Sequence, residues 1–331
     1  MNKVVVISGA AGMTGSKTSE YLLNKGYSVV GFDNFFAGSR KLIDELNKNE
    51  KFVFFENDIN NSEQMDFLYD YVEKNYKDYE KYFINCAAVV HTKHFYHPDS
   101  TFTTNVVSMR DSLERCINLG YTRYINCSTS EVYSMKSWVE GGTKEEDAIL
   151  LATAEQSLRT SYASGKLLTE FFMKDAVEQG RIKGCSMRFA NVYSPDEVYS
   201  DHIIPHIIDS IRDNNKVVLL ENAKETQRTF LNNHDSCMAV IKLLENKNCL
   251  DGSIYNVGTQ EEIYIVDLVK KIAELMGKKD INIEFQGRRT ADPPRRLLNV
   301  SKIQKRAGWY AEVSLEQGLK ECIEKRVGVL V

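Results

Sequence analysis

The chain has 331 residues and a formal net charge of −4, from 42 lysines and arginines against 46 aspartates and glutamates. This length permits one large domain or two lobes that share an interface. The near balance of charge, with no dense basic block, excludes nucleic acid and anionic membranes as first choices of partner. The sequence starts directly with an apolar run and has no stretch of 18 apolar residues, so we expect a cytoplasmic protein without a membrane anchor.

The predicted elements begin with apolar runs of strand length near residues 4, 28, 51, 82, 124 and 184, with helical segments between them. The runs are continuous rather than alternating, which is typical of strands covered on both faces. The pattern predicts an α/β fold, a Rossmann-type doubly wound parallel sheet. Gly26 marks the expected end of the first helix, and the "NNSE" stretch at 60–63 marks the expected start of another.

The regular alternation ends near residue 190. Residues 190–233 and 263–331 are predicted to form a smaller C-terminal substrate-binding lobe, and residues 1–189 the main domain. The "YNVGT" stretch near residue 255 resembles one more buried strand, so we assign residues 234–262 to the main domain as well. The predicted boundary is therefore discontinuous.

Cysteine and histidine spacing gives no sign of a metal site. The seven cysteines are scattered without a C-x-x-C pair, and we expect reduced, buried thiols. His91, His94 and His97 recur at every third position, but Pro98 indicates an irregular loop and no Cys or carboxylate is spaced to complete a site. We predict no metal, and a histidine-bearing loop near a ligand.

A glycine-rich loop follows the first apolar run. Gly9, Gly12 and Gly15 stand between a predicted strand and a predicted helix. Glycines at this spacing allow a tight turn and let backbone N–H groups and the helix N-terminus approach a pyrophosphate. Asp33 ends the second strand, 18 residues after Gly15, where a carboxylate can accept both hydroxyls of a ribose. The loop and Asp33 together predict a dinucleotide site.

Two neighbours refine this cofactor prediction. The carboxylate of Asp33 repels a 2′-phosphate and no basic residue adjoins it, the nearest in the sequence being Arg40, so we predict NAD rather than NADP. Asp58 follows the third strand and is placed to reach the adenine, although an ordinary loop aspartate would stand there equally well.

Tyr162 and Lys166 lie four residues apart in a segment that continues as a helix. This spacing puts both side chains on one face, one turn apart. A free tyrosine has a pKa of about 10, and a neighbouring ammonium group and a cationic nicotinamide both favour the phenolate. Tyr162 is therefore predicted to take a proton from an alcohol while a hydride leaves for the nicotinamide.

The chain resembles the extended short-chain dehydrogenase/reductases, specifically the nucleotide-sugar epimerase/dehydratase family. The resemblance covers nearly the whole chain. It rests on an ordered set of motifs: the glycine loop, Asp33, "NCAA" at 85–88, Asn105, "CSTSEVY" at 127–133, Y-x-x-x-K, "RFANVYSP" and "YNVG". It implies tightly held NAD, oxidation at C4 of a nucleotide-diphosphate sugar, a small lobe that grips the diphosphate, and a place in glycan precursor synthesis.

The resemblance also implies roles for single residues. Tyr162 is the base, Lys166 holds the nicotinamide ribose and Thr129 bonds the reacting hydroxyl. The implied cofactor contacts are Gly9, Gly12, Gly15, Asp33, Asn34, Asp58, Ile59, Ala87, Tyr162 and Lys166. The implied substrate contacts are Thr129, Ser130, Asn191, Arg228 and Arg289, with the two arginines near the diphosphate. A homodimer or dimer of dimers is implied through the helices near 100–118 and 160–178.

The fate of the 4-keto sugar stays open. Once C4 is a ketone, the hydrogens on C3 and C5 become acidic, and Glu131 is predicted as the base over the ring. The Thr-Ser-Glu order resembles both GDP-mannose 4,6-dehydratases and UDP-glucuronate decarboxylases. Dehydration, epimerisation and release of the 4-keto sugar all remain.

Three residues near 194 depart from the family pattern. Asp196 and Glu197 stand where relatives have a cation, which disfavours a substrate carboxylate and hence decarboxylation. Ser194 replaces a glycine, which weakens the match to the dehydratases. The alternatives are a UDP-glucuronate-type decarboxylase and a non-catalytic NAD-sensing regulatory protein, and the latter would be expected to have lost Tyr162 or Lys166.

Overall fold

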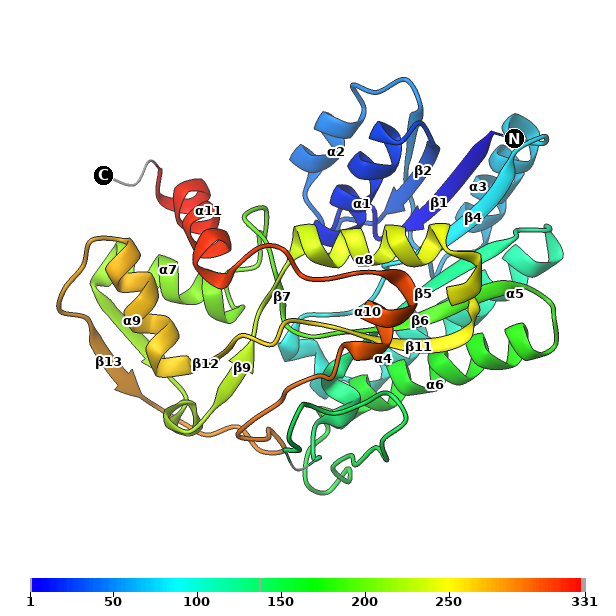
Figure 1. Cartoon of the computed structure of the whole chain (residues 1–331). Coiled ribbons are helices and arrows are strands. Elements are labelled where there is room, and N and C mark those ends of the chain that lie inside the picture. Colours follow the sequence, from blue (N-terminus) through cyan, green and yellow to red (C-terminus); the bar gives the residue numbers. More distant parts are fainter. Residues whose placement is uncertain (1, 137, 329–331) are drawn as a thin grey trace.

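A parallel sheet of seven strands is the largest element of the computed structural model, which describes residues 2–136 and 138–328. The sheet lies on the right of Figure 1, and its strand order is β11-β6-β5-β4-β1-β2-β3. The strands are β1 (Lys3–Ser8), β2 (Ser28–Asp33), β3 (Phe52–Glu56), β4 (Glu80–Asn85), β5 (Arg123–Thr129), β6 (Lys183–Phe189) and β11 (Asp251–Val257). The strand order reverses between β1 and β4, and such a point opens a crevice at the carboxyl ends of the strands. The predicted doubly wound fold is confirmed.

Helices cover both faces of the sheet. In β1, Val4 and Val6 pack into one hydrophobic cluster with α3, α5 and α6, whereas Val5 and Ile7 pack into another with α1, α2 and α8. The helices are α1 (Met13–Asn24), α2 (Arg40–Leu46), α3 (Ser62–Asn75), α5 (Ser108–Asn118), α6 (Thr160–Glu178) and α8 (Asn233–Glu245). A short helix α4 (Pro98–Phe102) and a π-helical turn η2 (Thr103–Val107) lead into α5. Burial on both faces is the reason why the strands are continuously apolar.

Both predicted helix boundaries are found. α1 ends at Asn24, and Gly26 follows with a φ of +87°, the left-handed conformation that favours glycine at a helix end. α3 starts at Ser62, where the side chain of Asn61 accepts a hydrogen bond from the backbone N–H of Gln64.

The smaller lobe, on the left of Figure 1, has its own hydrophobic cluster. Its helices are α7 (Ile203–Asn214), α9 (Ile265–Leu275) and α11 (Leu315–Val327). Its strands are β8 (Lys216–Leu219), β9 (Gln227–Thr229), β12 (Glu262–Tyr264) and β13 (Asn282–Phe285), which form the pairs β8–β13 and β9–β12. Two short strands, β7 (Val192–Tyr193) and β10 (Leu231–Asn232), pair in parallel where the chain enters and leaves the lobe.

The chain crosses between the two cores more than once. β11 contains the "YNV" stretch and pairs with β6, so this stretch does form a strand of the main sheet. Val300, Ile303 and Trp309, on and beside α10 (Ser301–Ala307), also pack into the main core, although the predicted boundary assigns them to the small lobe. The division into domains stays a prediction, and these contacts add a further return of the chain.

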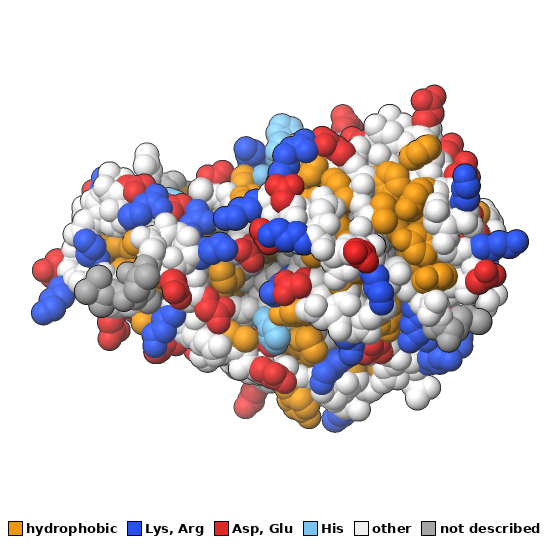
Figure 2. All heavy atoms as spheres, turned by 90° about the horizontal axis from the view of Figure 1, so that it is seen from above, with side chains coloured by type: hydrophobic (Ala, Val, Ile, Leu, Met, Phe, Trp, Pro, Cys, Tyr) orange, Lys and Arg blue, Asp and Glu red, His pale blue; other side chains and the backbone are white. Residues whose placement is uncertain are grey.

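The structure bears on two predictions about the protein's surroundings: the balanced surface charge and the lack of a membrane-spanning helix. Figure 2 shows acidic and basic side chains interspersed over one face, without a large region of one sign. In residues 2–136 and 138–328, no helix is both long enough and apolar enough to cross a lipid bilayer. The cytoplasmic location and the small-molecule partner stay predictions from the sequence.

Candidate functional site

The glycine loop joins β1 to α1 in a narrow space beside the end of β4. Gly9 has a φ of +69°, and a Cβ on it would lie 2.8 Å from the backbone nitrogen of Ala87. A Cβ on Gly15 would lie 2.1 Å from the carbonyl oxygen of Gly9. α1 follows directly after Gly12, so its N-terminal N–H groups and the positive end of its dipole open on the crevice. This cradle has no room for side chains at two positions and fits a pyrophosphate.

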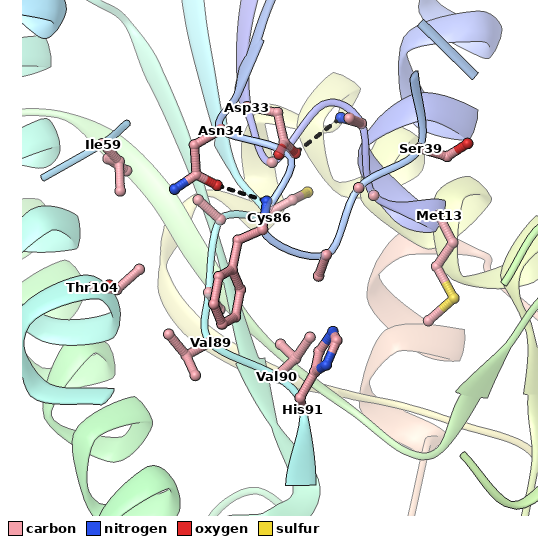
Figure 3. Close-up of a pocket in the computed structure, with 18 of the residues that line it drawn as sticks. Met13, Asp33, Asn34, Ser39, Ile59, Cys86, Val89, Val90, His91 and Thr104 are labelled. Atoms are coloured by element: carbon pink, nitrogen blue, oxygen red, sulfur yellow. Dashed lines mark hydrogen bonds between the residues drawn. The ribbon is translucent and has the colours of Figure 1, made fainter. Parts of the chain in front are cut away.

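A cavity of about 350 Å³ lies at the carboxyl ends of β1, β2, β3 and β4. Most of the predicted cofactor residues line it: Gly9, Gly12, Asp33, Asn34, Asp58, Ile59 and Ala87. In Figure 3, Asp33 and Asn34 lie at one end of the cavity, and Val90 and His91 lie at the other. Gly15 packs against Gly9 behind this wall. The structure therefore brings seven of the ten predicted cofactor residues together around one space, while Tyr162 and Lys166 lie on α6 and do not line this cavity.

Asp33 is fixed at its end of the cavity by backbone donors. Its Oδ2 accepts the N–H of Ala11 at 3.1 Å, and its Oδ1 accepts the N–H of Phe35 at 2.7 Å. Burial raises the pKa of Asp33, and these backbone hydrogen bonds oppose the rise. Arg40 forms a bidentate pair with Glu56 at 2.6 and 2.8 Å. Arg40, the cation nearest to Asp33 in the sequence, is thus paired with another carboxylate.

The tyrosine and lysine lie one turn apart on α6, and both are buried. The Nζ of Lys166 donates to the carbonyl oxygen of Cys127, two residues before Thr129, at 2.8 Å. Burial lowers the pKa of Lys166. Burial also raises the pKa of Tyr162, the charge of Glu131 raises it further, and a hydrogen bond with Thr129 opposes the rise. The phenol therefore needs a nearby positive charge before it can act as a base at neutral pH.

A second aromatic ring covers Tyr162. The ring of Phe95 lies parallel to it, with centroids 3.9 Å apart and an angle of 7° between the planes. Phe95 belongs to the 3-10 turn η1 (Thr92–Tyr96), and its carbonyl oxygen accepts the hydroxyl of Ser161 at 2.9 Å. The chain segment that leaves β4 thus lines the cofactor cavity near Ala87 and then packs on the predicted base.

The predicted ring base is held by two arginines. Oε2 of Glu131 accepts Nη1 of Arg159 at 2.5 Å, and Oε1 accepts Nη1 of Arg296 at 2.6 Å. Burial favours a raised pKa, but the charges of Arg296 and Arg159 outweigh it, and the pKa of Glu131 lies well below its ordinary value. A carboxylate stabilised in this way is a weak base. The geometry argues against the base role of Glu131, which stays a prediction.

The two arginines have hydrogen-bonding groups to spare. Both side chains are about 7% exposed. In the part of the chain that the structure describes, Nε of Arg159 and both Nε and Nη2 of Arg296 have no hydrogen-bond partner. Buried polar groups normally find a partner, so these N–H groups are suited to an anionic ligand beside Glu131.

The two arginines that are predicted to bind the diphosphate both lie beside one aspartate, Asp292. Nη2 of Arg228 donates to Oδ1 of Asp292 at 2.6 Å, and Nη1 of Arg289 lies 3.9 Å from the other oxygen of Asp292. Burial and the neighbouring Arg296 lower the pKa of Arg228 to about 10. Asn191, predicted to support the sugar phosphate, donates to the carbonyl oxygen of Thr229 at 3.0 Å. The structure brings the two arginines together and joins them, through Asp292 and Arg296, to the surroundings of Glu131.

The acidic pair near residue 196 lies elsewhere. Asp196 and Glu197 line the cofactor cavity. Asp196 pairs with Lys325 at 3.2 Å, and Glu197 pairs with His202. The sequence argument treated these carboxylates as neighbours of a substrate carboxylate. Because both have cationic or imidazole partners and face the cofactor cavity, that argument against decarboxylation loses its basis.

The histidine loop lies beside the cofactor cavity. His91 lines the cavity, and its ring centroid lies 3.6 Å from that of Tyr199. Burial and the neighbouring imidazoles of His202 and His94 lower the pKa of His91 to about 4. No group of three or more His, Cys, Asp or Glu side chains within residues 2–136 and 138–328 is arranged to hold a metal ion.

Three residues of this site escaped the sequence analysis: Arg159, Arg296 and Phe95. Arg159 stands three residues before Tyr162, so its position on the same helical segment was an available signal. In the arginine-rich stretch "RRTADPPRR", the predicted residue is Arg289, whereas Arg296 contacts Glu131. No sequence signal links Phe95, in the loop of the three histidines, to Tyr162.

Comparison with known proteins gives one consistent result. A family model described as GDP-mannose 4,6 dehydratase matches residues 6–322. The chain is 28% identical to a UDP-N-acetyl-alpha-D-glucosaminuronate decarboxylase of Bacillus cytotoxicus, over 98% of each chain.

Two solved structures share the fold. The UDP-glucose 4-epimerase of Thermotoga maritima, with UDP-glucose, has a TM-score of 0.85 and 23% identity, and the match covers 97% of this chain and 98% of that one. The UDP-glucuronic acid 4-epimerase of Bacillus cereus, in complex with UDP-glucuronic acid and NAD, has a TM-score of 0.84 and 23% identity, with the same coverage.

Proposed function

Because the chain belongs to the GDP-mannose 4,6 dehydratase family, we propose that it uses NAD to oxidise C4 of a nucleotide-diphosphate sugar. The observation that carries this proposal is that two sets of residues lie side by side. One is the glycine-lined cavity with Asp33, and the other is the buried Thr129 at the end of β5 with Tyr162 and Lys166 of α6. Phe95 and Cys127 connect them, since each contacts the catalytic side and belongs to a strand or loop beside the cavity.

NAD rather than NADP is supported by the charges around the cavity. Asp33 presents a fixed carboxylate where a ribose would bind, and Arg40 is paired with Glu56. A relative in fold, the Bacillus cereus epimerase, was solved with NAD. When bound, NAD supplies the acceptor for a hydride and a positive charge beside Tyr162.

The chain's own groups then handle the proton. Thr129 holds the C4 hydroxyl, Tyr162 accepts its proton at the phenolic oxygen, and the ammonium group of Lys166 favours the phenolate. The parallel ring of Phe95 excludes water from one face of Tyr162. Arg228 and Arg289 bind the diphosphate, for which Asp292 is the competing partner in the free protein.

A second candidate concerns the next step, decarboxylation of a 4-keto uronic acid. It is favoured by the unpartnered, buried N–H groups of Arg159 and Arg296, which suit a carboxylate at C5. The relative of 28% identity bears the name of a uronate decarboxylase. A 4-keto group makes the adjacent C5 carboxylate a good leaving group as CO₂, and no general base at Glu131 is then required.

Product analysis tests both proposals. The protein is incubated with NAD and, in turn, UDP-glucuronic acid, UDP-N-acetylglucosaminuronic acid, UDP-glucose and GDP-mannose, and the mass of each product is measured. Loss of CO₂ from a uronate supports decarboxylation, loss of water from a neutral sugar supports 4,6-dehydration, and an unchanged mass with altered stereochemistry at C4 supports epimerisation. The absence of any product or of NADH with every sugar contradicts C4 oxidation.

The dimer stays part of this proposal. Phe102 of α4 and Leu168 and Phe171 of α6 are 55%, 41% and 64% exposed, on the two segments that the family resemblance places at a subunit contact. Replacing Phe171 with Glu is expected to convert a dimer into a monomer, as judged by light scattering. A wild-type monomer at micromolar concentration contradicts this expectation.

A further inference from the structure

Two cysteines face each other between the cofactor cavity and Lys166. Asn85 of β4 is opposite Asn126 of β5, and the next pair along these parallel strands is Cys86 and Cys127. Their Sγ atoms are 3.7 Å apart. Opposed residues of neighbouring strands have Cα atoms about 4.8 Å apart, and disulfides form over Cα distances of about 4.4 to 6.8 Å. The ordinary spacing of neighbouring strands thus lies within the range of Cα distances over which a disulfide forms.

One thiol of the pair, Cys86, is accessible from the cavity, whereas Cys127 is buried behind it. Of the seven cysteines, Cys86 alone is partly exposed, and the other six are buried. Cys86 lines the cofactor cavity and is drawn among its walls in Figure 3. A small oxidant that enters the cavity therefore reaches this thiol, whereas a bound dinucleotide would cover it.

The environment makes the two thiols unequal. The hydrogen bond between them lowers the pKa of Cys127, and the ammonium group of Lys166 lowers it further against the effect of burial. The same hydrogen bond, together with burial, raises the pKa of Cys86. Cys127 is therefore the more acidic thiol of the pair, and a thiol of lowered pKa reacts more readily with oxidants.

We propose that Cys86 and Cys127 form a redox-reactive dithiol that hydrogen peroxide converts to a disulfide. One thiolate attacks a peroxide oxygen, the O–O bond breaks, and a sulfenic acid and hydroxide form, the latter leaving as water. The second sulfur attacks the sulfenic sulfur, the S–O bond breaks and a second water leaves. Each sulfur gives up one electron, and the peroxide takes both. The proposal goes beyond C4 oxidation and does not depend on the identity of the sugar.

The disulfide would disturb the site from both strands. The sulfur atoms must approach from 3.7 Å to about 2.05 Å. The carbonyl oxygen of Cys127 accepts Nζ of Lys166, Thr129 is two residues further on, and Ala87 next to Cys86 touches the glycine loop. A displacement of about 1 Å at a catalytic site costs on the order of 100-fold in rate. We expect a loss of turnover of that size, reversed by dithiothreitol.

The first experiment needs only the wild-type protein. After treatment with hydrogen peroxide, free thiols are alkylated with iodoacetamide, the protein is digested, and the peptides are identified by mass. We expect a peptide pair linked through Cys86 and Cys127, two fewer alkylated thiols, return of both after dithiothreitol, and slower loss in excess NAD. Recovery of both cysteines as separate alkylated or sulfinic residues contradicts the proposal, whether or not the protein shows activity with any sugar.

Variants connect the linkage to its effect. Activity after peroxide is expressed relative to each protein's own untreated activity. Cys86→Ser and Cys127→Ser should each abolish the inactivation that dithiothreitol reverses, whereas Cys322→Ser, a buried thiol of the small lobe, should behave like wild type. If the two serine variants inactivate reversibly like wild type, the effect comes from other residues and the proposal fails.

A binding probe covers the case in which a serine variant does not fold. Phenylarsine oxide bridges two thiols that lie close together, and one equivalent should protect both Cys86 and Cys127 of the wild-type protein from iodoacetamide. Protection of neither residue means that the thiols do not act as a pair.

Discussion

The cofactor end and the substrate end of the candidate site each hold a partly buried carboxylate, Asp33 and Glu131, and the two carboxylates have different hydrogen-bond partners. Asp33 accepts hydrogen bonds from the backbone N–H groups of Ala11 and Phe35, which are 22 and 2 positions away in the chain. Glu131 accepts hydrogen bonds from the guanidinium groups of Arg159 and Arg296, which are 28 and 165 positions away. Asp33 is therefore stabilised by neutral backbone dipoles of one local unit, whereas Glu131 is stabilised by charged side chains from distant segments of the chain.

This difference indicates what each end can recognise. At the cofactor end, the backbone donors and the glycine cradle are set by the β1–α1–β2 unit, which suits a ligand common to many proteins. At the substrate end, the cations of Arg159, Arg228, Arg289 and Arg296 outnumber the anions of Glu131 and Asp292. An excess of positive charge at a largely buried site favours the binding of an anion, and in the proposed function this anion is the diphosphate or carboxylate of the substrate.

The largest expected effect tests the chemistry that both ends share. Tyr162→Phe removes the phenolic oxygen and should lower turnover by at least about 100-fold, the usual effect of losing a general base. NAD binding and the thermal unfolding temperature should stay close to wild type, and Tyr310→Phe, an exposed tyrosine, serves as the control. Near-normal turnover of a folded Tyr162→Phe protein would assign the proton transfer to another group.

The next prediction compares the contribution of a buried arginine to the free energy of unfolding with that of a more exposed arginine next to it in the sequence. Arg296→Met removes a buried cation that pairs with Glu131, whose side chain is only 15% exposed, and should lower the free energy of unfolding by about 3 kcal/mol. The matched control is Arg295→Met, whose arginine pairs with Glu262 while one third exposed and should cost less than about 1 kcal/mol. Equal losses in urea unfolding would show that Arg296 is not an essential partner of Glu131.

A smaller effect concerns the cofactor end. Asp33→Ala removes a charged acceptor, and the loss of a hydrogen bond to a charged group costs about 1.5 to 3 kcal/mol. NAD affinity should fall by about tenfold or more while NADP affinity changes little, so the ratio of the affinities for NAD and NADP becomes smaller. Arg40→Ala should leave the preference intact, because Arg40 is paired with Glu56. Equal affinity of the wild-type protein for both dinucleotides, measured by calorimetry, would refute the predicted preference.

The smallest effect is a dependence on pH. The two arginines hold the pKa of Glu131 below its unfolded value, which is about 4.3. A lowered folded pKa contributes stability that is fully present above pH 4.3 and is lost as the pH falls toward the folded pKa. The stability difference between wild type and Glu131→Gln should therefore be constant from pH 5 to 7 and shrink by about 1 kcal/mol per pH unit below pH 4.

The control for this titration is Glu284→Gln, an exposed carboxylate that pairs with Lys216. Its stability difference should stay near zero at each pH. If the Glu131 difference does not change between pH 6 and pH 3.5, the carboxylate is not held by Arg159 and Arg296 in solution.

The sequence by itself determined the parts that depend on local chain geometry. Continuous apolar runs are typical of strands covered on both faces, so they predicted the parallel sheet. The order of motifs predicted the family, which the match over residues 6–322 confirms. Gly9, Gly12 and Asp33 share one β-α-β unit, so their spacing alone predicted a common cavity wall. Tyr162 and Lys166 lie on one helix, so their four-residue spacing was enough to predict that both side chains lie on the same face of it.

The tertiary structure decided what depends on distant segments. Arg296 is 165 positions from Glu131, and no period or spacing in the sequence connects a loop before α10 to the end of β5. The sequence could therefore offer Glu131 as a free base, whereas the fold surrounds it with two guanidinium groups that lower its pKa. The position of Asp196 and Glu197 in a sequence motif likewise did not indicate their partners. In the folded chain, Asp196 pairs with Lys325 of α11 and Glu197 pairs with His202, beside the cofactor cavity. The pKa of a side chain depends on every charge within a few ångströms, and that set is known only after the chain has folded.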